Sequence, residues 1–95
     1  MSPVVSLQVL EFLQNLPPEP RRALRLGIKR LPKHLGDIRP LEGKLRDYYR
    51  LRVGSYRVIF KRRMEKGNSL VECLYVNRRS IVYEVFEKLA GHPEA

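Results

Sequence analysis

The stretch YYRLRVGSYRVIF, residues 48–60, contains two short runs in which apolar and cationic residues alternate, separated by a Gly-Ser pair. Alternation with a period of two is typical of half-buried β-strands. A Gly-X pair between two such runs indicates a two-residue type II′ hairpin turn. We therefore predict paired strands over residues 47–53 and 56–62, with Gly54 in the turn.

This turn places Arg52 directly opposite Arg57 on the neighbouring strand. Like charges in this position repel each other and destabilise the strand pair. The apolar face of the hairpin, which we expect to meet helices, consists of Leu51, Val53, Tyr56, Val58 and Phe60. The other face consists of Arg50, Arg52, Arg57, Ile59 and Lys61. Its cations are either exposed charges that keep the strands soluble, or an anion site. In an anion site, a phosphate between Arg52 and Arg57 turns repulsion into charge-assisted hydrogen bonding.

The residues before the hairpin predict two helices. A possible short strand at residues 4–7 precedes a short helix over 9–13, which the prolines at 17–18 end. A second helix follows, and its apolar stripe consists of Leu24, Ile28, Leu31 and Leu35. Pro32 should kink or end this helix. Its remaining surface is crowded with the cations Arg21, Arg22, Arg25, Lys29 and Arg30. They form either a solvated face or a contact surface for phosphate or an acidic partner.

The residues around the hairpin complete a sheet. We predict a loop over residues 36–47, a looser turn over 63–69 and a third, central strand over 70–76. The last segment is a short strand or a helix. A helix is favoured by the i, i+4, i+8 spacing of Ile81, Val85 and Leu89. This order is typical of an α+β fold, with N-terminal helices packed on one face of a small twisted antiparallel sheet. We expect one domain over residues 1–95, with basic residues on the sheet face that the helices leave exposed.

The chain is strongly basic. Nineteen Lys and Arg stand against ten Asp and Glu, which gives a net charge of +9 and a pI near 10.2. Thirteen of these nineteen cations are Arg, whose planar guanidinium fits phosphate better than the point charge of Lys does. The expected partner is therefore polyanionic, either a nucleic acid or an acidic protein.

Other residues with reactive side chains are few. Cys73 is the only cysteine, and its apolar strand favours a buried, inert thiol over a nucleophile. His34 and His92 are isolated, and no cluster has the spacing of metal ligands. We expect no metal, no cofactor and no membrane partner. We also expect a cytoplasmic protein, because the chain has neither a run of about 18 apolar residues nor a signal-peptide pattern. Catalysis would then rest on Arg, Lys and Tyr, which can cleave RNA because the 2′-hydroxyl supplies the nucleophile.

Arg78 and Arg79 directly follow the third strand, and Tyr83 comes four residues after Arg79. A tyrosine beside clustered cations can stack on a base or act as an acid or base. It can equally be a packing residue of the last element. The sequence pattern alone leaves both interpretations open.

These motifs resemble those of the RelE/ParE superfamily of toxins from bacterial toxin–antitoxin systems, and the RelE branch more than the ParE branch. The similarity lies in LEG at residues 41–43, YRLRVG at 49–54, YRVIF at 56–60 and RRSIVY at 78–83. It is close in the C-terminal half, whereas the helical N-terminal half agrees only in length and order. Many relatives have Gly-His or Gly-Lys where this chain has Val-Asn at 76–77, which removes a candidate proton donor.

The resemblance implies an mRNA interferase, an endoribonuclease that cuts mRNA in the ribosomal A site without a metal and leaves a 2′,3′-cyclic phosphate. By position, Arg50 and Arg52 match strand cations that contact the RNA backbone and support acid–base chemistry. Arg57 matches the arginine that stabilises the scissile phosphate, and Tyr83 matches the tyrosine that orients or deprotonates the 2′-hydroxyl. The basic residues that are expected to bind RNA nearby are Lys61, Arg78 and Arg79.

The resemblance also implies partners. They are a cognate acidic antitoxin that covers the cationic face, the ribosome with its mRNA, and operator DNA bound only through the toxin–antitoxin complex. It does not decide whether Arg78 or Arg79 enters the site. Two alternatives stay open: a ParE-like inhibitor of DNA gyrase without nuclease activity, and a non-catalytic basic RNA-binding module.

Overall fold

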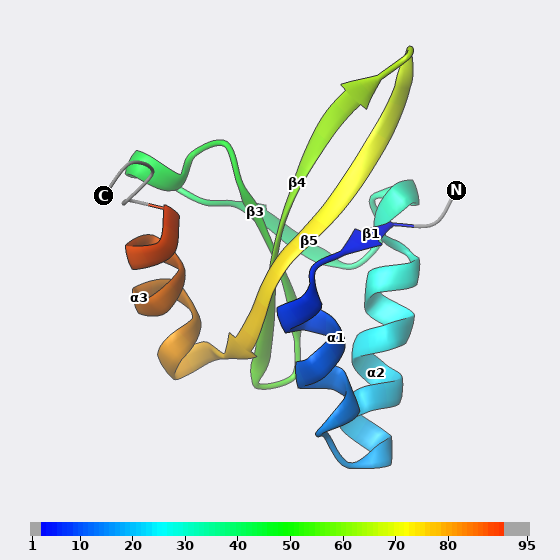
Figure 1. Cartoon of the computed structure of the whole chain (residues 1–95), viewed down its shortest axis with the longest axis vertical. Coiled ribbons are helices and arrows are strands. Elements are labelled where there is room, and N and C mark those ends of the chain that lie inside the picture. Colours follow the sequence, from blue (N-terminus) through cyan, green and yellow to red (C-terminus); the bar gives the residue numbers. More distant parts are fainter. Residues whose placement is uncertain (1–2, 91–95) are drawn as a thin grey trace.

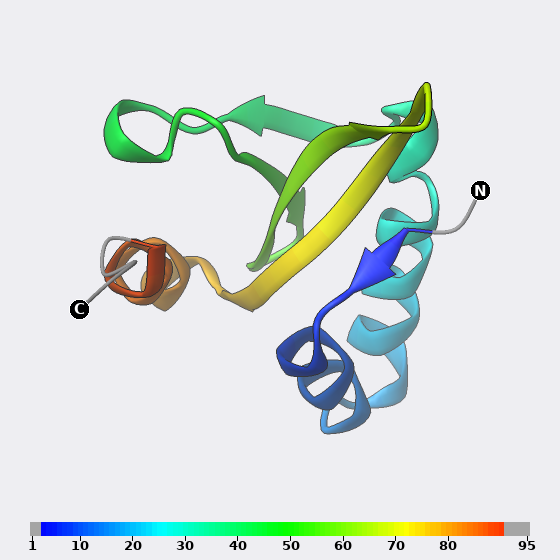
Figure 2. The ribbon, with the colours of Figure 1, turned by 45° about the horizontal axis from the view of Figure 1, so that its top comes forward.

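A five-stranded sheet in the order β1-β5-β4-β3-β2 lies between two helices on one side and a third helix on the other. The computed structural model describes residues 3–90, and Figures 1 and 2 show this layered arrangement. The strands are β1 (Val4–Val5), β2 (Asp37–Pro40), β3 (Tyr49–Val53), β4 (Tyr56–Glu65) and β5 (Asn68–Arg78). The helices are α1 (Leu7–Gln14), α2 (Pro18–Lys29) and α3 (Arg79–Ala90), with single 3₁₀ turns η1 (Leu31–Lys33) and η2 (Gly43–Leu45). The expected α+β class is confirmed; His92 lies outside the described residues.

The two N-terminal helices form where the sequence predicts them. Ser6 begins α1 as an N-cap, because its hydroxyl accepts a hydrogen bond from the backbone N–H of Val9 at 3.2 Å. The helix α2 ends at Lys29, and the chain continues into η1 at Pro32. The apolar stripe is shorter than predicted, because Leu35 lies beyond this break and is 51% exposed.

The hairpin at the centre of the sequence has the predicted register, with Arg52 paired to Arg57 and Val53 to Tyr56. Gly54 has a φ of +58°, whereas Ser55 is not among the residues with positive φ, as a type II′ turn requires. The predicted looser turn over residues 63–69 is wrong.

Lys66 and Gly67 both have positive φ, at 52° and 82°, and they make a tight two-residue turn. The strands β4 and β5 therefore continue beyond the body of the sheet as a long two-stranded arm (Figure 1).

The sheet differs from the predicted antiparallel sheet in two ways, although the short strand predicted at residues 4–7 is present as β1. The segment predicted as a loop contains β2, which pairs antiparallel with β3 and places Asp37 opposite Arg52. The short β1 pairs parallel with β5, so the sheet is mixed. The edge strand β2 has no strong hydrophobic pattern, since Ile38 is its one half-buried apolar side chain.

The hydrophobic core has two parts, one on each face of the sheet. Under α1 and α2 lie the predicted apolar residues of the hairpin, including Leu51, Val58 and Phe60. Under α3 lies a smaller cluster of Leu45, Ile59, Tyr75, Val82 and Phe86.

The sequence pattern predicts that the helices leave the second sheet face exposed. In the structure, α3 covers part of this face. The helical prediction for the last segment is confirmed, but the predicted stripe is not the buried one, since Ile81 and Leu89 are 41% and 63% exposed.

Candidate functional site

The candidate site is the part of the second sheet face that lies beside the apolar cluster under α3. We call it the cationic face, and it consists of Asp37, Arg39, Arg50, Arg52, Arg57, Lys61 and Asn77. Residues directly opposite each other on paired strands share a face. One row across β2, β3, β4 and β5 is Asp37, Arg52, Arg57 and Asn77. The neighbouring row is Arg39, Arg50, Ile59 and Tyr75.

Arg57 is a buried cation with only neutral partners. It is 6% exposed, and its Nη1 donates hydrogen bonds of 2.9 Å to the carbonyl oxygens of Gly54 and Tyr56. Within residues 3–90 no carboxylate lies within 4.0 Å of it. A buried guanidinium is costly without an opposite charge. An anion bound here would supply that charge.

The charges of Arg50 and Arg52, unlike that of Arg57, are balanced by a carboxylate, that of Asp37 on β2. The Asp37 carboxylate accepts a hydrogen bond from Arg50 Nη1 at 3.2 Å and lies 4.0 Å from Arg52 Nη1. Arg50 also donates to the backbone carbonyl of Asp37 at 3.0 Å. Because the segment of β2 was predicted to be a loop, the pairing of Asp37 with these arginines was not predicted.

The opposition of Arg52 and Arg57 therefore does not by itself require an anion, contrary to the argument from the sequence. Arg52 lies beside Asp37, and Arg57 bonds to carbonyls of its own turn. The feature that does point to an anion is the unbalanced charge of Arg57.

The sequence pattern also did not identify Asn77 and Tyr75, two polar residues on this side of the sheet. Asn77 lies opposite Arg57, and its Nδ2 donates a hydrogen bond of 2.9 Å to the Tyr75 hydroxyl, while its Oδ1 accepts one from the Arg78 N–H at 2.8 Å. Tyr75 is 8% exposed. A β-bulge in β5 pairs Tyr75 rather than Leu74 with Ile59, and the pattern of residues 70–76 does not reveal that extra residue.

Tyr83 lies on α3, on the same side of the sheet as Arg57. Its side chain is half-buried and packs against the cluster that contains Ile59, Tyr75 and Phe86. The packing interpretation of Tyr83 is thus confirmed, and its role towards RNA stays a prediction.

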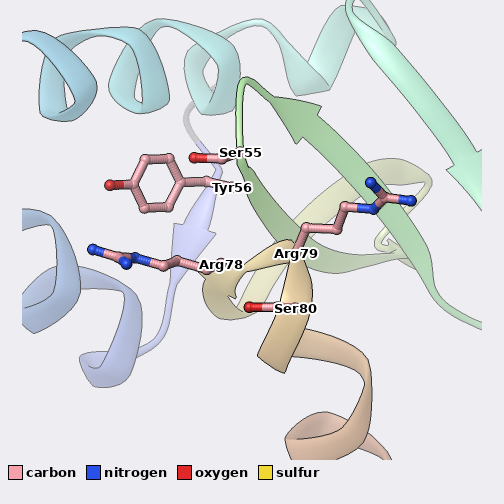
Figure 3. A pocket seen from close by; sticks show the side chains of 5 residues that line it. All are labelled: Ser55, Tyr56, Arg78, Arg79 and Ser80. Atoms are coloured by element: carbon pink, nitrogen blue, oxygen red, sulfur yellow. The ribbon is translucent and has the colours of Figure 1, made fainter.

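The remaining predicted cations lie apart from one another. Lys61 lies opposite Glu72, at the base of the β4–β5 arm. Arg78 pairs with Tyr56 and therefore faces α1 and α2, away from Arg57. Figure 3 shows Arg78 and Tyr56 pointing one way and Arg79 pointing the opposite way. Of the two cations, Arg79 is thus the one directed away from the helices α1 and α2.

A cavity of about 520 Å³ lies where α3 begins, and it is shown in Figure 3. Its lining consists of Ser55, Tyr56, Arg78, Arg79 and Ser80. The backbone N–H of Arg79 donates to the carbonyl of Ser55 at 2.8 Å, which joins α3 to the turn that also holds Arg57. The cavity therefore extends the positive charge of the sheet around the hairpin turn.

Cys73 takes no part in this site. It is 1% exposed, and burial raises the pKa of its thiol to about 12, so the thiol stays protonated at neutral pH. This confirms the predicted buried thiol. Over the described part of the chain, no three His, Cys, Asp or Glu residues are grouped so that they could hold a metal ion. None of the helices described in residues 3–90 is both long and apolar enough for a membrane span.

Neither a protein-family model nor a curated protein matches the sequence. Solved structures do match the fold. A YoeB/ParE toxin from Agrobacterium tumefaciens aligns with a TM-score of 0.68 and 18% identity, over 83% of this chain and 99% of its own. A chain of the RelB–RelE antitoxin–toxin complex from Methanococcus jannaschii aligns with a TM-score of 0.64 and 22% identity, over 87% and 98%. A chain of the archaeal RelE–RelB complex from Pyrococcus horikoshii aligns with a TM-score of 0.56 and 29% identity, over 85% and 99%.

Proposed function

Because the chain has the fold of the RelE/ParE toxin superfamily, as its sequence motifs indicated, we propose that it is the toxin of a type II toxin–antitoxin system. In this proposal the domain of residues 1–95 acts in the cytoplasm as a metal-independent, ribosome-dependent mRNA endoribonuclease that blocks translation. The observation that supports the nuclease most strongly is Arg57, a cation that is only 6% exposed and has no carboxylate partner among residues 3–90.

Arg57 binds the scissile phosphate. Its Nη1 is already hydrogen-bonded to two carbonyls, so the guanidinium is held in place before RNA arrives. Its Nε and Nη2 have no protein acceptor within residues 3–90 and are free for phosphate oxygens. Negative charge grows on those oxygens as the phosphorus becomes five-coordinate. A fixed cation in a partly dry site stabilises that charge without having to reorganise.

The reaction itself is a transfer within the RNA strand. The 2′-oxygen forms a bond to phosphorus while the bond to the 5′-oxygen breaks, which gives a 2′,3′-cyclic phosphate and a 5′-hydroxyl. Tyr83 orients the 2′-hydroxyl or takes its proton, and water on the open side of the face protonates the leaving oxygen. Arg50 and Arg52 bind the flanking phosphates, which replace Asp37 as their partner.

The partner that keeps the toxin inactive is an acidic antitoxin. The structures from Methanococcus jannaschii and Pyrococcus horikoshii are toxin–antitoxin complexes, which supports an antitoxin for this chain as well. Its carboxylates would occupy the cations that RNA phosphates otherwise bind. Operator DNA is then bound only through the complex.

Cleavage on programmed ribosomes tests the proposal. Purified chain is mixed with ribosomes carrying a 5′-labelled mRNA, and the new 3′ ends are mapped and checked for a cyclic phosphate. A DNA gyrase supercoiling assay runs in parallel, because a YoeB/ParE toxin is among the similar structures. Intact mRNA with inhibited supercoiling would replace the nuclease by a gyrase inhibitor. RNA binding with neither effect would leave a non-catalytic binding module.

A further inference from the structure

A second concentration of positive charge lies along α2 and η1, on the opposite side of the sheet from the cationic face (Figure 2). We call its members the α2 cations: Arg21, Arg22, Arg25, Lys29, Arg30 and Lys33. Arg21 is half-buried and the others are exposed. None of the ion pairs formed within residues 3–90 involves any of them.

Helix stability explains only some of these charges. Lys29, Arg30 and Lys33 lie at the C-terminal end of α2 or just beyond it, where the helix dipole favours cations. Arg21 lies near the N-terminal end, where the dipole disfavours them. In addition, Arg25 is four residues from both Arg21 and Lys29, a spacing at which like charges repel. A helix surface selected only for solubility would alternate with Glu instead.

A cavity of about 730 Å³ opens at one end of this row. It lies between the end of α2, η1 and the first residues of β5. Three of the α2 cations line it, namely Lys29, Arg30 and Lys33. Asn68 and Ser69 add polar side chains of the kind that contact phosphate oxygens. None of the lining residues is aromatic, so the cavity offers no platform on which an unpaired base would stack.

We propose that the α2 cations and this cavity form a second nucleic-acid-binding surface, which takes the phosphate backbone of a double helix. From Arg21 to Lys29 the row runs along about 12 Å of helix. A duplex carries one negative charge per about 1.7 Å of its axis, so a rigid row of this length meets several charges at once. An acidic peptide would meet the row with fewer and more mobile charges. The sheet separates this surface from the cationic face, so both can be occupied together.

The test compares two triple variants that lose the same net charge. The first is Arg25→Gln, Lys29→Gln, Lys33→Gln. The matched control is Lys44→Gln, Arg46→Gln, Lys88→Gln, at exposed positions outside the α2 row. Binding of a labelled RNA duplex and a labelled DNA duplex is measured by fluorescence anisotropy from 50 to 200 mM salt, a range chosen because phosphate contacts respond strongly to it. Circular dichroism and thermal melting check that both variants fold.

We expect the first variant to bind the duplexes more weakly. The salt slope of log K for its binding to DNA should be smaller by up to about 2.7, which is about 0.9 for each of the three lost phosphate contacts. The control should keep most of the slope. Tighter binding of the RNA duplex than of the DNA duplex would identify RNA as the natural source of the phosphates. Equal binding would show that the surface recognises the phosphate backbone whether it belongs to RNA or to DNA. Equal losses in both variants would overturn the proposal. So would unchanged duplex binding in the first variant together with loss of binding to poly-glutamate, which would identify a protein partner. The assay contains no ribosomes and measures no cleavage, so its result is independent of the proposed nuclease.

Discussion

Asp37 is the carboxylate that a flanking RNA phosphate must replace, and Asp37→Asn isolates that competition. The lost ion pairs are modest in energy. The pair with Arg50 is at 3.2 Å with side chains 14% and 47% exposed, and the pair with Arg52 is at 4.0 Å with 57% and 47%. Exposed pairs contribute about 0.2–1 kcal/mol each. Arg50 keeps its bond to the backbone carbonyl of residue 37. For the two pairs together we expect the free energy of unfolding to fall by about 0.4–2 kcal/mol.

The same substitution should strengthen RNA binding. It removes one negative charge from the cationic face and frees Arg50 and Arg52 for phosphate. One additional neutralised phosphate makes the salt slope for a single strand steeper by about 0.7. At 50 mM salt we expect several-fold tighter binding of a short single-stranded RNA.

The assay is fluorescence anisotropy with a labelled single-stranded RNA over a range of salt concentrations. Glu65→Gln is the matched control, because it also removes one exposed carboxylate paired to an arginine, Arg63 at 3.7 Å, but on the β4–β5 arm. The control should leave affinity and slope nearly unchanged. Weaker binding by Asp37→Asn, or an unchanged slope, would show that Asp37 shapes the site rather than competing with phosphate for it.

Two further predictions concern single atoms. Tyr83→Phe keeps the ring that packs from α3 against the cluster of Ile59 and Tyr75, and removes only the hydroxyl. It should therefore slow cleavage by about 10²–10⁴ while RNA affinity changes less than about twofold; equal losses in both would indicate docking alone. Burial raises the pKa of the Cys73 thiol from 9.0 to about 12, so the folded chain keeps this thiol protonated. The protonated thiol contributes its full stability to the fold below pH 9. This contribution is lost as the pH rises, because the thiol of the unfolded chain ionises first. Between pH 8 and 10, urea denaturation of the natural chain should lose about 1.4 kcal/mol more than that of Cys73→Ala, and parallel losses would contradict the burial argument.

The hairpin could be predicted because its signals are local. The alternation of residues 48–60 and a glycine with positive φ at position 54 determine both the register and the faces, so the Arg52–Arg57 pairing is already visible in the sequence. The apolar core under α1 and α2 follows from the same alternation.

What the sequence did not reveal depends on contacts between distant segments. The edge strand β2 is short and mostly polar, so its pairing with β3, and with it the Asp37 partner of two arginines, leaves no periodic pattern. The bulge that brings Asn77 opposite Arg57 is likewise invisible in an apolar run. The buried face of α3 is decided by Val82 and Phe86 meeting Ile59 and Tyr75, a contact that helical spacing alone cannot select.

In the proposed nuclease, Arg57 stabilises the charge of the scissile RNA phosphate. Single-turnover cleavage of mRNA on programmed ribosomes tests this role directly, with Arg57→Gln against the exposed control Arg46→Gln. Glutamine is preferred to alanine because its amide can still donate to a turn carbonyl that Arg57 holds at 2.9 Å, so the hairpin keeps its support. We expect Arg57→Gln to cleave about 10²–10³ times more slowly, while its melting curve stays cooperative and Arg46→Gln cleaves at the natural rate. Cleavage by a folded Arg57→Gln at the rate of the natural chain would contradict this role.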